Sequence, residues 1–277
     1  MRLVTWNTHS LVGKEWEQVE REQRQTGEYL SRLCPDVIAL QEVNQPREGR
    51  ILPPNPRGRW YSCEKSIPIR EGNYLVGVLG HLPPAYRGVW LPMKVGYDRF
   101  DEGLGLIFRG EVAELRWLPI SASRSYENWR TRYALFLKRK GEEDWFCDLH
   151  LGWWEDGEEG FLSQWNRLRG AFPRSERLWL LGDFNSSPDL RGQGYDAVAS
   201  SGFYDCFTLA QRTRGEETVA RRDLDGWQKR GHEGSMRIDQ IWCRYPARIE
   251  SCQVCLDGQN GPSSSDHYGV WVETHER

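Results

Sequence analysis

YALFLKRKGEEDWFCDLHL, residues 133–151, is the stretch that decides the class of fold. Two runs of apolar and aromatic residues, Tyr133–Lys138 and Trp145–Leu151, flank the glycine-containing turn Lys140–Glu143. Two strand-like runs joined by a short turn with glycine are typical of a β-hairpin, in which the strands pair antiparallel. The stretch therefore predicts a sheet with antiparallel strands.

Similar apolar runs recur on both sides of this hairpin, and we expect most of them to form strands. They are Leu3–Trp6, Val37–Leu40, Tyr74–Leu79, Leu104–Phe108, Tyr133–Leu137, Trp145–Leu149, Leu178–Leu181, Ile238–Trp242 and Val270–Val272. Two other segments are expected to be helices: Glu15–Leu33, which ends before Pro35, and Phe161–Phe172, with apolar residues at helical spacing. Many strands with few helices favour two packed sheets with helices outside, a layered α/β sandwich.

The 277 residues contain no internal repeat and no linker-like stretch, so we expect a single domain spanning residues 1–277. The formal net charge of −3 does not provide the strong positive field with which proteins grip nucleic-acid backbones. No stretch approaches the roughly 18 apolar residues of a membrane helix, and no leader precedes Arg2–Thr5. We therefore expect a cytoplasmic protein with no membrane partner, for which nucleic acid is a disfavoured substrate.

The seven cysteines are scattered and lie mostly in strand-like runs, which suits a reducing compartment and argues against a disulfide framework. Cys252 and Cys255 form a C-x-x-C pair, but no second pair at zinc spacing accompanies them. We expect neither a zinc site nor a redox centre at this pair.

Polar residues interrupt the apolar runs at the points where strands should end. Asn7 follows LVTW, Glu42 follows DVIALQ, His150 follows WFCDL, and Asp183 and Asn185 follow LWLLG. Neighbouring strand ends and the loops beyond them can converge on one rim of a sandwich, where binding and catalytic groups often meet. An Asp-Phe-Asn after an apolar run is also typical of a turn or a helix cap.

Taken together, these residue types favour a catalytic site over turns and helix caps. Oxygen ligands from Glu, Asp and Asn suit a hard, hydrated ion such as Mg²⁺ or Mn²⁺, and histidines transfer protons near neutral pH. The residue types therefore predict metal-assisted hydrolysis.

Six motifs in this order carry a resemblance to a known family. They are TWNTHS with Asn7, IALQEV with Glu42, LHL with His150, GDFN with Asp183 and Asn185, RIDQI with Asp239, and SDH with Asp266 and His267. Through them the chain resembles the endonuclease/exonuclease/phosphatase family from residue 5 to residue 272. The resemblance implies a four-layered αββα sandwich of two mostly antiparallel sheets, with a metal-dependent phosphoric ester hydrolase site at one rim.

The same resemblance implies roles for the motif residues. Glu42 would be the principal metal ligand, with Asn7 and Asp266 beside it, mostly through water because Mg²⁺ gives up its waters reluctantly. The ion would polarise the phosphoryl oxygens. Asp183 and Asn185 would position the attacking water and steady the phosphate.

The two histidines would handle protons and charge. His267 would accept a proton, and His150 would stabilise charge or protonate the leaving oxygen. In members like pancreatic deoxyribonuclease two carboxylates orient these histidines, and the matching residues here would be Asp239 for His150 and Glu102 for His267.

Two further residues have alternative interpretations. Arg132, in NWRTRY, falls where such enzymes place a phosphate-contacting arginine, but it would equally suit a surface salt bridge. His9 stands where some DNA-repair relatives have an Asp of the metal site, which weakens the case for a second metal. We expect His9 to be a structural histidine in preference to a phosphate contact.

Longer strings, LHLGWWEDGEEGF, GDFNSSPDLRGQGYD and NGPSSSDHYGV, resemble the bacterial maltose-6-phosphate phosphatases within the family. This resemblance implies a Mg²⁺-dependent phosphomonoesterase that acts on a small sugar phosphate such as maltose 6-phosphate. Trp153, Trp154 and Trp227 would offer indole faces to the sugar, although such rings also stack on unpaired bases or fill protein cores. The acidic run Glu155–Glu159 would repel a polyanionic strand, or it is a solvated surface loop.

Two alternatives remain beside the sugar phosphatase. One is a Mg²⁺-dependent nuclease or phosphodiesterase, DNase-like or sphingomyelinase-like, which a basic groove or an exposed hydrophobic hairpin would favour. The other is a non-catalytic binding protein that has kept the fold.

Overall fold

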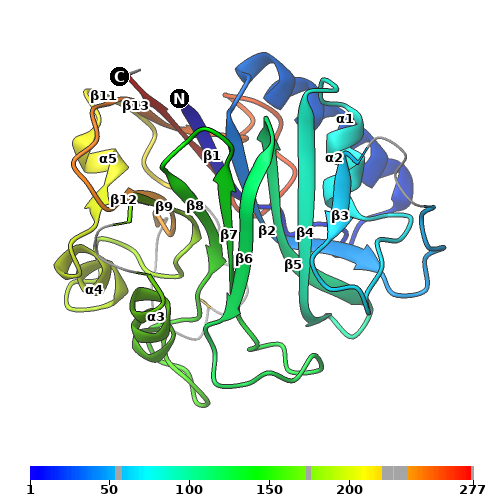
Figure 1. Cartoon of the computed structure of the whole chain (residues 1–277), viewed down its shortest axis with the longest axis horizontal. Helices are drawn as coiled ribbons and strands as arrows, with labels where there is room; N and C mark the ends of the chain where they lie inside the picture. Colours follow the sequence, from blue (N-terminus) through cyan, green and yellow to red (C-terminus); the bar gives the residue numbers. More distant parts are fainter. Residues whose placement is uncertain (54–57, 173–175, 220–226, 228–235, 276–277) are drawn as a thin grey trace.

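Two β-sheets stacked face to face form the centre of the structure, a computed structural model (Figure 1). It describes residues 1–53, 58–172, 176–219, 227 and 236–275. Within these residues the larger sheet has eight strands, in the spatial order β11 (Arg212–Arg214), β13 (Ile249–Cys255), β14 (Gly269–Thr274), β1 (Arg2–Asn7), β2 (Val37–Pro46), β5 (Phe100–Arg109), β4 (Tyr86–Gly96) and β3 (Trp60–Ser62). The smaller has six, in the order β10 (Tyr204–Asp205), β12 (Asp239–Cys243), β9 (Leu178–Asp183), β8 (Trp145–His150), β7 (Tyr133–Arg139) and β6 (Val112–Pro119).

The sheets are mostly antiparallel, as expected. Strands β7 and β8 form the predicted antiparallel hairpin. Among the described strands, parallel pairing occurs at β1/β2, β3/β4, β8/β9 and β11/β13. The pairs β1/β2 and β8/β9 matter for the site because each brings the carboxyl ends of two strands to the same edge.

Five helices are found in the described residues, and four of them cover the outer faces of the sheets (Figure 1). They are α1 (Trp16–Leu33), α2 (Tyr74–Gly80), α3 (Phe161–Gly170), α4 (Gly194–Ser200) and the short α5 (Cys206–Leu209). Helices α1 and α2 pack on the eight-stranded sheet, and α3 and α4 pack on the six-stranded sheet. The predicted four-layered αββα sandwich, with helices near residues 15–33 and 161–172, is therefore confirmed.

Each central strand is buried on both faces. In β1, Leu3 packs in the core between the sheets, whereas the next residue, Val4, packs in the core under α1 and α2. Successive side chains of a strand point to opposite faces, so burial of both faces requires an uninterrupted apolar run. This requirement explains the unbroken runs in the sequence.

The expected strand at Tyr74–Leu79 is wrong, because this segment forms helix α2. The Asn73 side chain caps it by accepting a hydrogen bond from the Val76 N–H at 3.2 Å. Gly77 allows close packing on α1, since a Cβ there would lie 2.2 Å from the Gln23 side chain. A short apolar run buried on most sides shows neither strand nor helix periodicity.

The C-x-x-C pair is split between the two faces of β13. Cys252 packs in the core between the sheets and Cys255 in the core under α1. All seven cysteines lie in the described ranges, and all are free. The two thiols of the pair therefore lie in different cores and point away from each other.

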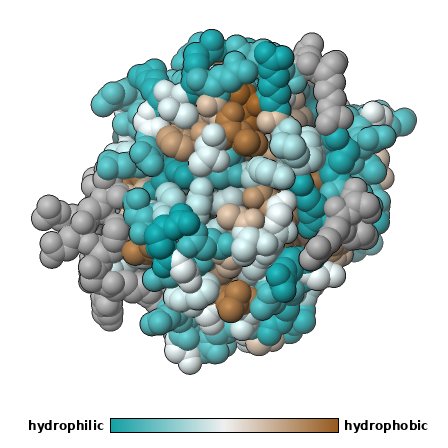
Figure 2. Space-filling model, turned by 90° about the vertical axis from the view of Figure 1, so that its left-hand side faces the viewer, coloured by the Kyte–Doolittle hydropathy of each residue, from teal (hydrophilic) through white to brown (hydrophobic). Residues whose placement is uncertain are grey.

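The outer surface of the α3/α4 layer is largely hydrophilic, with small separated apolar patches (Figure 2). None of the helices in the described part of the chain combines the length and the apolar character needed to cross a membrane.

Candidate active site

Five strands from the two sheets place the predicted site residues at one edge of the sandwich. Asn7 ends β1, His150 ends β8, Asp183 ends β9, and Asp239 begins β12. His150 and Asp183 are register partners on parallel strands, and Asp239 is the antiparallel partner of Asp183. The sheet pairing alone therefore brings these polar groups together.

The fifth strand, β2, carries Glu42 at an irregularity. Its pairing with β5 shifts register between Leu40 and Val43, and Glu42 has a left-handed φ of 49°. A non-glycine residue in this region is uncommon and is kept there only by its surroundings. The hydroxyls of Thr8 and Ser10 supply that support, since both donate to the Glu42 carbonyl oxygen, at 2.9 and 2.8 Å.

The GDFN motif needs its glycine for steric reasons. A Cβ on Gly182 would lie 2.0 Å from the Leu149 carbonyl oxygen of the neighbouring strand. Three residues on, Asn185 has a left-handed φ of 46°, and its backbone N–H donates to Asp183 Oδ1 at 2.8 Å. The motif thus ends β9 in a tight turn that directs both polar side chains to the site.

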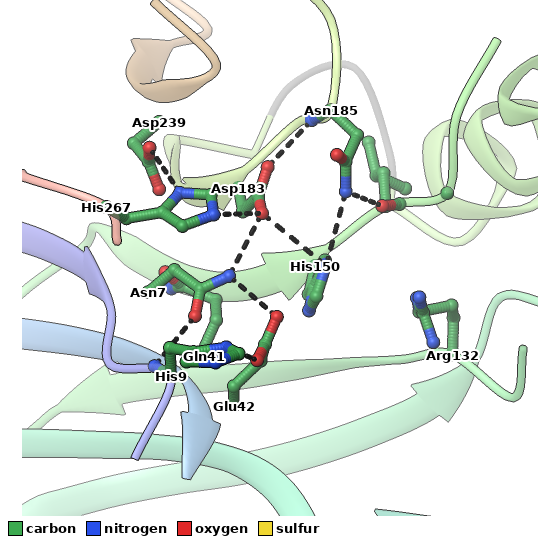
Figure 3. Close-up of polar contacts among 12 residues, drawn as sticks. Asn7, His9, Gln41, Glu42, Arg132, His150, Asp183, Asn185, Asp239 and His267 are labelled. Atoms are coloured by element: carbon green, nitrogen blue, oxygen red, sulfur yellow. Dashed lines mark hydrogen bonds and ion pairs between the residues drawn. The ribbon is translucent and has the colours of Figure 1, made fainter. Parts of the chain in front are cut away.

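Asn7 links the two sheets at the centre of the network (Figure 3). Its Nδ2 donates to Glu42 Oε1 at 3.0 Å, and it also donates to Asp183 Oδ2 at 3.1 Å. Burial alone would raise the pKa of Glu42, but His9, His150 and Asn7 hold it well below the usual range. Glu42 is therefore a carboxylate at neutral pH.

His267 is held by Asp239. Its Nδ1 lies 2.9 Å from Asp239 Oδ2, and its Nε2 lies 4.0 Å from Asp183 Oδ2. Burial alone would lower the pKa of His267, but Asp239 and Asp183 raise it to about 10. Burial and then Asp239 raise the pKa of Asp183 to about 7. The three groups form a buried acid–histidine–acid cluster.

His150 sits on the other side of Asp183. Its Nε2 lies 3.2 Å from Asn185 Nδ2 and 3.5 Å from Asp183 Oδ2. Burial and then Arg132 lower its pKa well below the ordinary value, so the ring is neutral. Its Nδ1 is buried and has no hydrogen-bond partner among the described residues.

The predicted orienting acids are wrong. Asp239 contacts His267 rather than His150. Glu102 contacts neither histidine, because it is the cross-strand partner of Lys94 and its Oε1 lies 2.9 Å from Lys94 Nζ. Glu102 still lines the cleft beside the site.

Two buried cations lie in this cleft, which has a volume of about 470 Å³. Arg132 is 4% exposed and Lys94 is 5% exposed. Arg132 Nη1 donates to the Trp129 carbonyl oxygen at 2.7 Å, whereas its Nε has no acceptor among the described residues. Burial lowers the pKa of both groups, and Glu102 and Glu42 act in the opposite direction on each. Arg132 is thus not a surface salt bridge.

Two sets of side chains could hold a cation. Glu42 Oε2 and Asp266 Oδ1 lie 3.1 and 3.8 Å from His9 Nδ1, so the two carboxylates are close neighbours around this ring nitrogen. His9 is hydrogen-bonded to Glu42, as expected for a structural histidine, and it also lines the cleft.

The second set is Asp183, Asp239 and His267, whose ligand atoms come within 4.8 Å of one another. There Asp239 Oδ2 contacts His267 Nδ1, whereas Asp239 Oδ1 has no hydrogen-bond partner among the described residues. The Glu42 and Asp266 oxygens face the cleft, so we regard the first set as the better fit to a hard ion.

The three tryptophans considered for substrate stacking have different surroundings. Trp153 lines the cleft. Trp154 packs against Phe161, at a ring centroid distance of 6.2 Å, and is not among the described residues that line the cleft. Trp227 is 6% exposed and donates from Nε1 to Asn185 Oδ1 at 3.1 Å. Of the three, the structure brings only Trp153 to the cleft wall.

Three acids of the 155–159 run are used to fix a neighbouring loop. Asp156 Oδ1 accepts from Arg130 Nε at 2.7 Å, and Glu158 accepts from the Asn128 side chain at 2.8 Å. Glu159 accepts from the backbone N–H of Ala122 at 2.7 Å and also pairs with Arg167. These paired charges hold the 120–132 loop in place and are a poor means of repelling a polyanion.

Some residues of the site were not predicted. Lys94 interrupts the apolar run LPMKVG, and a lone lysine inside a strand pattern is a usable signal of a buried charge. Trp129 lies three residues before Arg132 and also lines the cleft. Thr8 and Ser10, within TWNTHS, act through the Glu42 backbone, which the sequence alone does not indicate.

Comparison with known proteins agrees with this geometry. The sequence matches the Endonuclease/Exonuclease/phosphatase family over residues 4–267. No curated protein matches the sequence.

Several solved structures share the fold. An endonuclease/exonuclease/phosphatase family protein from Leptotrichia buccalis superposes with a TM-score of 0.82 at 21% identity, over 100% of both chains. A mannosyl-6-phosphatase from Bacteroides thetaiotaomicron gives a TM-score of 0.66 at 17% identity, again over 100% of both chains. A 3′ phosphatase from Neisseria bound to a product DNA hairpin gives 0.63 at 15% identity, over 100% of both chains.

Proposed function

The chain belongs to the endonuclease/exonuclease/phosphatase family, and on that premise we propose that it is a metal-dependent phosphomonoesterase that acts on a small sugar phosphate such as maltose 6-phosphate. The products would be the free sugar and inorganic phosphate. The solved mannosyl-6-phosphatase of this fold supports a sugar phosphate as the class of substrate.

The observation that carries the proposal is the buried guanidinium of Arg132. It lines the cleft with His150, Asp183 and Lys94, and its Nε–H has no acceptor among the described residues. A buried, unsatisfied donor costs free energy unless a ligand fills it. A phosphate dianion supplies the missing acceptor and gains charge-assisted hydrogen bonds.

The donor set fits Mg²⁺ or Mn²⁺. Glu42 and Asp266 would hold the ion, and Asn7, which donates to Glu42, completes the set from one side. When bound, such an ion polarises the phosphoryl oxygens.

The remaining groups suit attack by water on phosphorus. As the oxygen of water bonds to phosphorus, its proton would pass to the Asp183–His267–Asp239 chain. The bond from phosphorus to the sugar oxygen breaks. His150 Nδ1 would donate a hydrogen bond to that leaving oxygen, which takes its proton from solvent.

A nuclease or phosphodiesterase is the alternative, and the Neisseria phosphatase with DNA bound represents it. The net charge of −3 argues against a polyanionic substrate, because no overall positive field attracts one. The described cations of the cleft are buried at its floor and do not form an exposed stripe.

The test is phosphate release from maltose 6-phosphate, glucose 6-phosphate, a nucleotide monophosphate and a synthetic phosphodiester, with plasmid nicking in parallel. Each reaction is run with Mg²⁺ and with EDTA. We expect phosphate release from the sugar phosphates only with Mg²⁺, and no nicking. Diester cleavage or nicking with inert sugar phosphates would establish the alternative instead.

Glu42→Gln serves as the matched variant for metal binding. Mg²⁺ should raise the melting temperature of the wild-type protein, because a ligand that binds only the folded state stabilises it. The variant should lose most of this rise. An equal rise in both proteins would show that Glu42 is not a metal ligand.

A further inference from the structure

The hairpin tip between β4 and β5 is strained at two consecutive residues. Tyr97 and Asp98 have φ values of 50° and 56°, and the Arg99 N–H closes the turn on the Gly96 carbonyl oxygen at 3.1 Å. Two left-handed residues in a row are the signature of a type I′ turn, which strongly prefers Asn, Asp and Gly. A bulky tyrosine there is an outlier, and such strain concentrates at functional sites.

The strained turn places Tyr97 at the cleft. Its ring lies edge-on to His9, with centroids 5.8 Å apart and an interplanar angle of 89°. The residue lines the cleft and yet is 44% exposed. An aromatic ring of this kind offers an apolar surface to whatever occupies the mouth of the cleft.

A second exposed ring, Trp129, comes from the β6–β7 loop of the other sheet and is 43% exposed. It packs edge-on against Trp153 at 5.8 Å, and the Arg130 guanidinium lies 4.1 Å from its centroid. Arg130 is itself held by Asp156. Trp129 is therefore held in the wall by its contacts with Trp153 and Arg130.

Charge divides the cleft into two zones. Its cations, Arg132 and Lys94, are buried at the floor, whereas Asp98 is an exposed acid that lines the same cleft. Glu127 also lines the cleft, but its Oε1 lies 3.6 Å from Arg47 Nη2. A phosphate is attracted to the floor. A second negative group at the mouth would be repelled by the Asp98 carboxylate, which would instead accept hydrogen bonds from hydroxyl groups.

We propose that Tyr97 and Asp98, together with Trp129, determine specificity by binding a neutral, polyhydroxylated leaving group at the mouth of the cleft. The rings cover the apolar face of the group, and the Asp98 carboxylate accepts hydrogen bonds from its hydroxyls. This inference rests on the proposed phosphomonoesterase activity and extends it to the part of the substrate that is not phosphate.

The test uses Tyr97→Asn and Asp98→Asn, because asparagine tolerates the left-handed conformation and leaves the turn intact. Each variant is assayed on maltose 6-phosphate and on glycerol phosphate, whose leaving group is much smaller. Trp117→Ala is the matched control, since Trp117 is an exposed aromatic of β6 that is not among the described residues lining the cleft.

We expect each variant to raise the KM for maltose 6-phosphate by roughly 3- to 10-fold with kcat little changed, as for loss of uniform binding. The KM for glycerol phosphate should stay the same, and the control should match the wild type on both substrates. Asp98→Asn should also lower the KM for a sugar bisphosphate, because a like charge is removed.

Equal effects on both phosphomonoesters, or no effect on either, would overturn the inference and leave the phosphomonoesterase intact. A wild-type protein that releases phosphate from neither ester but cleaves a diester would overturn the proposed function, and the inference with it.

Discussion

The indole nitrogen of Trp227 donates a hydrogen bond to Asn185 Oδ1, and this contact decides which way the Asn185 amide points. With its oxygen occupied, the amide directs Nδ2 to the Leu151 carbonyl oxygen at 2.9 Å and to His150 Nε2 at 3.2 Å. A ring nitrogen that faces an N–H donor is an acceptor, so the His150 proton resides on Nδ1. Trp227 therefore acts on the tautomer of His150 from a buried position.

Trp227→Phe should lower kcat by roughly 2- to 10-fold, because it removes one neutral hydrogen bond but keeps most of the ring packing. The KM for a sugar phosphate should change little, and steady-state kinetics separate the two parameters. In an Asn185→Ala background the same substitution should have almost no further effect. A rise in KM without loss of kcat would contradict this role and indicate that Trp227 stacks on the sugar.

His267→Ala should reduce turnover by roughly 10²–10⁴-fold, since it removes a buried histidine of the group proposed to take up the proton of water. Asp239→Asn should act in the same direction, because it breaks the 2.9 Å contact that orients the ring. His81→Ala, at the end of α2, is the control and should leave turnover unchanged. Near-wild-type turnover of His267→Ala would show that His267 takes no part in catalysis.

Trp153→Ala should change substrate binding and Trp154→Ala should change stability, although the two residues are adjacent. Trp153 lines the cleft, so its loss should raise the KM for a sugar phosphate. Trp154 packs on Phe161, so its loss should lower the free energy of unfolding by about 2–4 kcal/mol and leave KM unchanged. Kinetics and urea denaturation of the two variants are the measurements, and a raised KM in Trp154→Ala would contradict this division.

Asp36→Asn should lower the free energy of unfolding at neutral pH but not in acid. Burial alone would raise the pKa of Asp36, but the Arg2 N–H at 2.7 Å and the Arg109 guanidinium at 2.5 Å hold it below its ordinary value of 3.8. A lowered folded-state pKa stabilises the protein above the unfolded pKa, and this stabilisation is lost as the pH falls through the folded pKa.

The difference in unfolding free energy between wild type and Asp36→Asn should be about 1–3 kcal/mol at pH 7 and should shrink below pH 3.8. Denaturation followed at several pH values measures it. Glu28→Gln, an exposed change on α1, provides the control. A difference that is independent of pH would mean that the charge of Asp36 is not responsible.

Most of the fold could be predicted from the sequence because alternate side chains of the central strands enter two different cores. Runs such as Trp145–Leu149 can satisfy both cores only as strands. Tyr74–Leu79 is also a short, mostly apolar run, but it packs against α1 and is capped as a helix by the single polar residue Asn73. Local pattern does not distinguish these two kinds of burial.

The convergence of the motif residues was predictable from the sequence, but their pairing was not. Asn7, Glu42, His150 and Asp183 follow apolar runs, and strand ends converge wherever sheets are packed. Which acid meets which histidine depends on strand order, and β12 pairs with β9 rather than β8. Tyr97 and Trp129 were not predicted, because they reach one cleft only through the arrangement of two hairpins from different sheets.

The Asn7 side-chain nitrogen connects residues of the two sheets. That atom holds Glu42 of the larger sheet and Asp183 of the smaller sheet at once. Asn7 and Glu42 both belong to the larger sheet, so sliding or parting of the sheets breaks the contact to Asp183 and separates the Glu42 side of the site from the Asp183 side. The site therefore belongs to the same cooperative unit as the central core, and its integrity follows the global stability of the sandwich rather than the fluctuations of a surface loop.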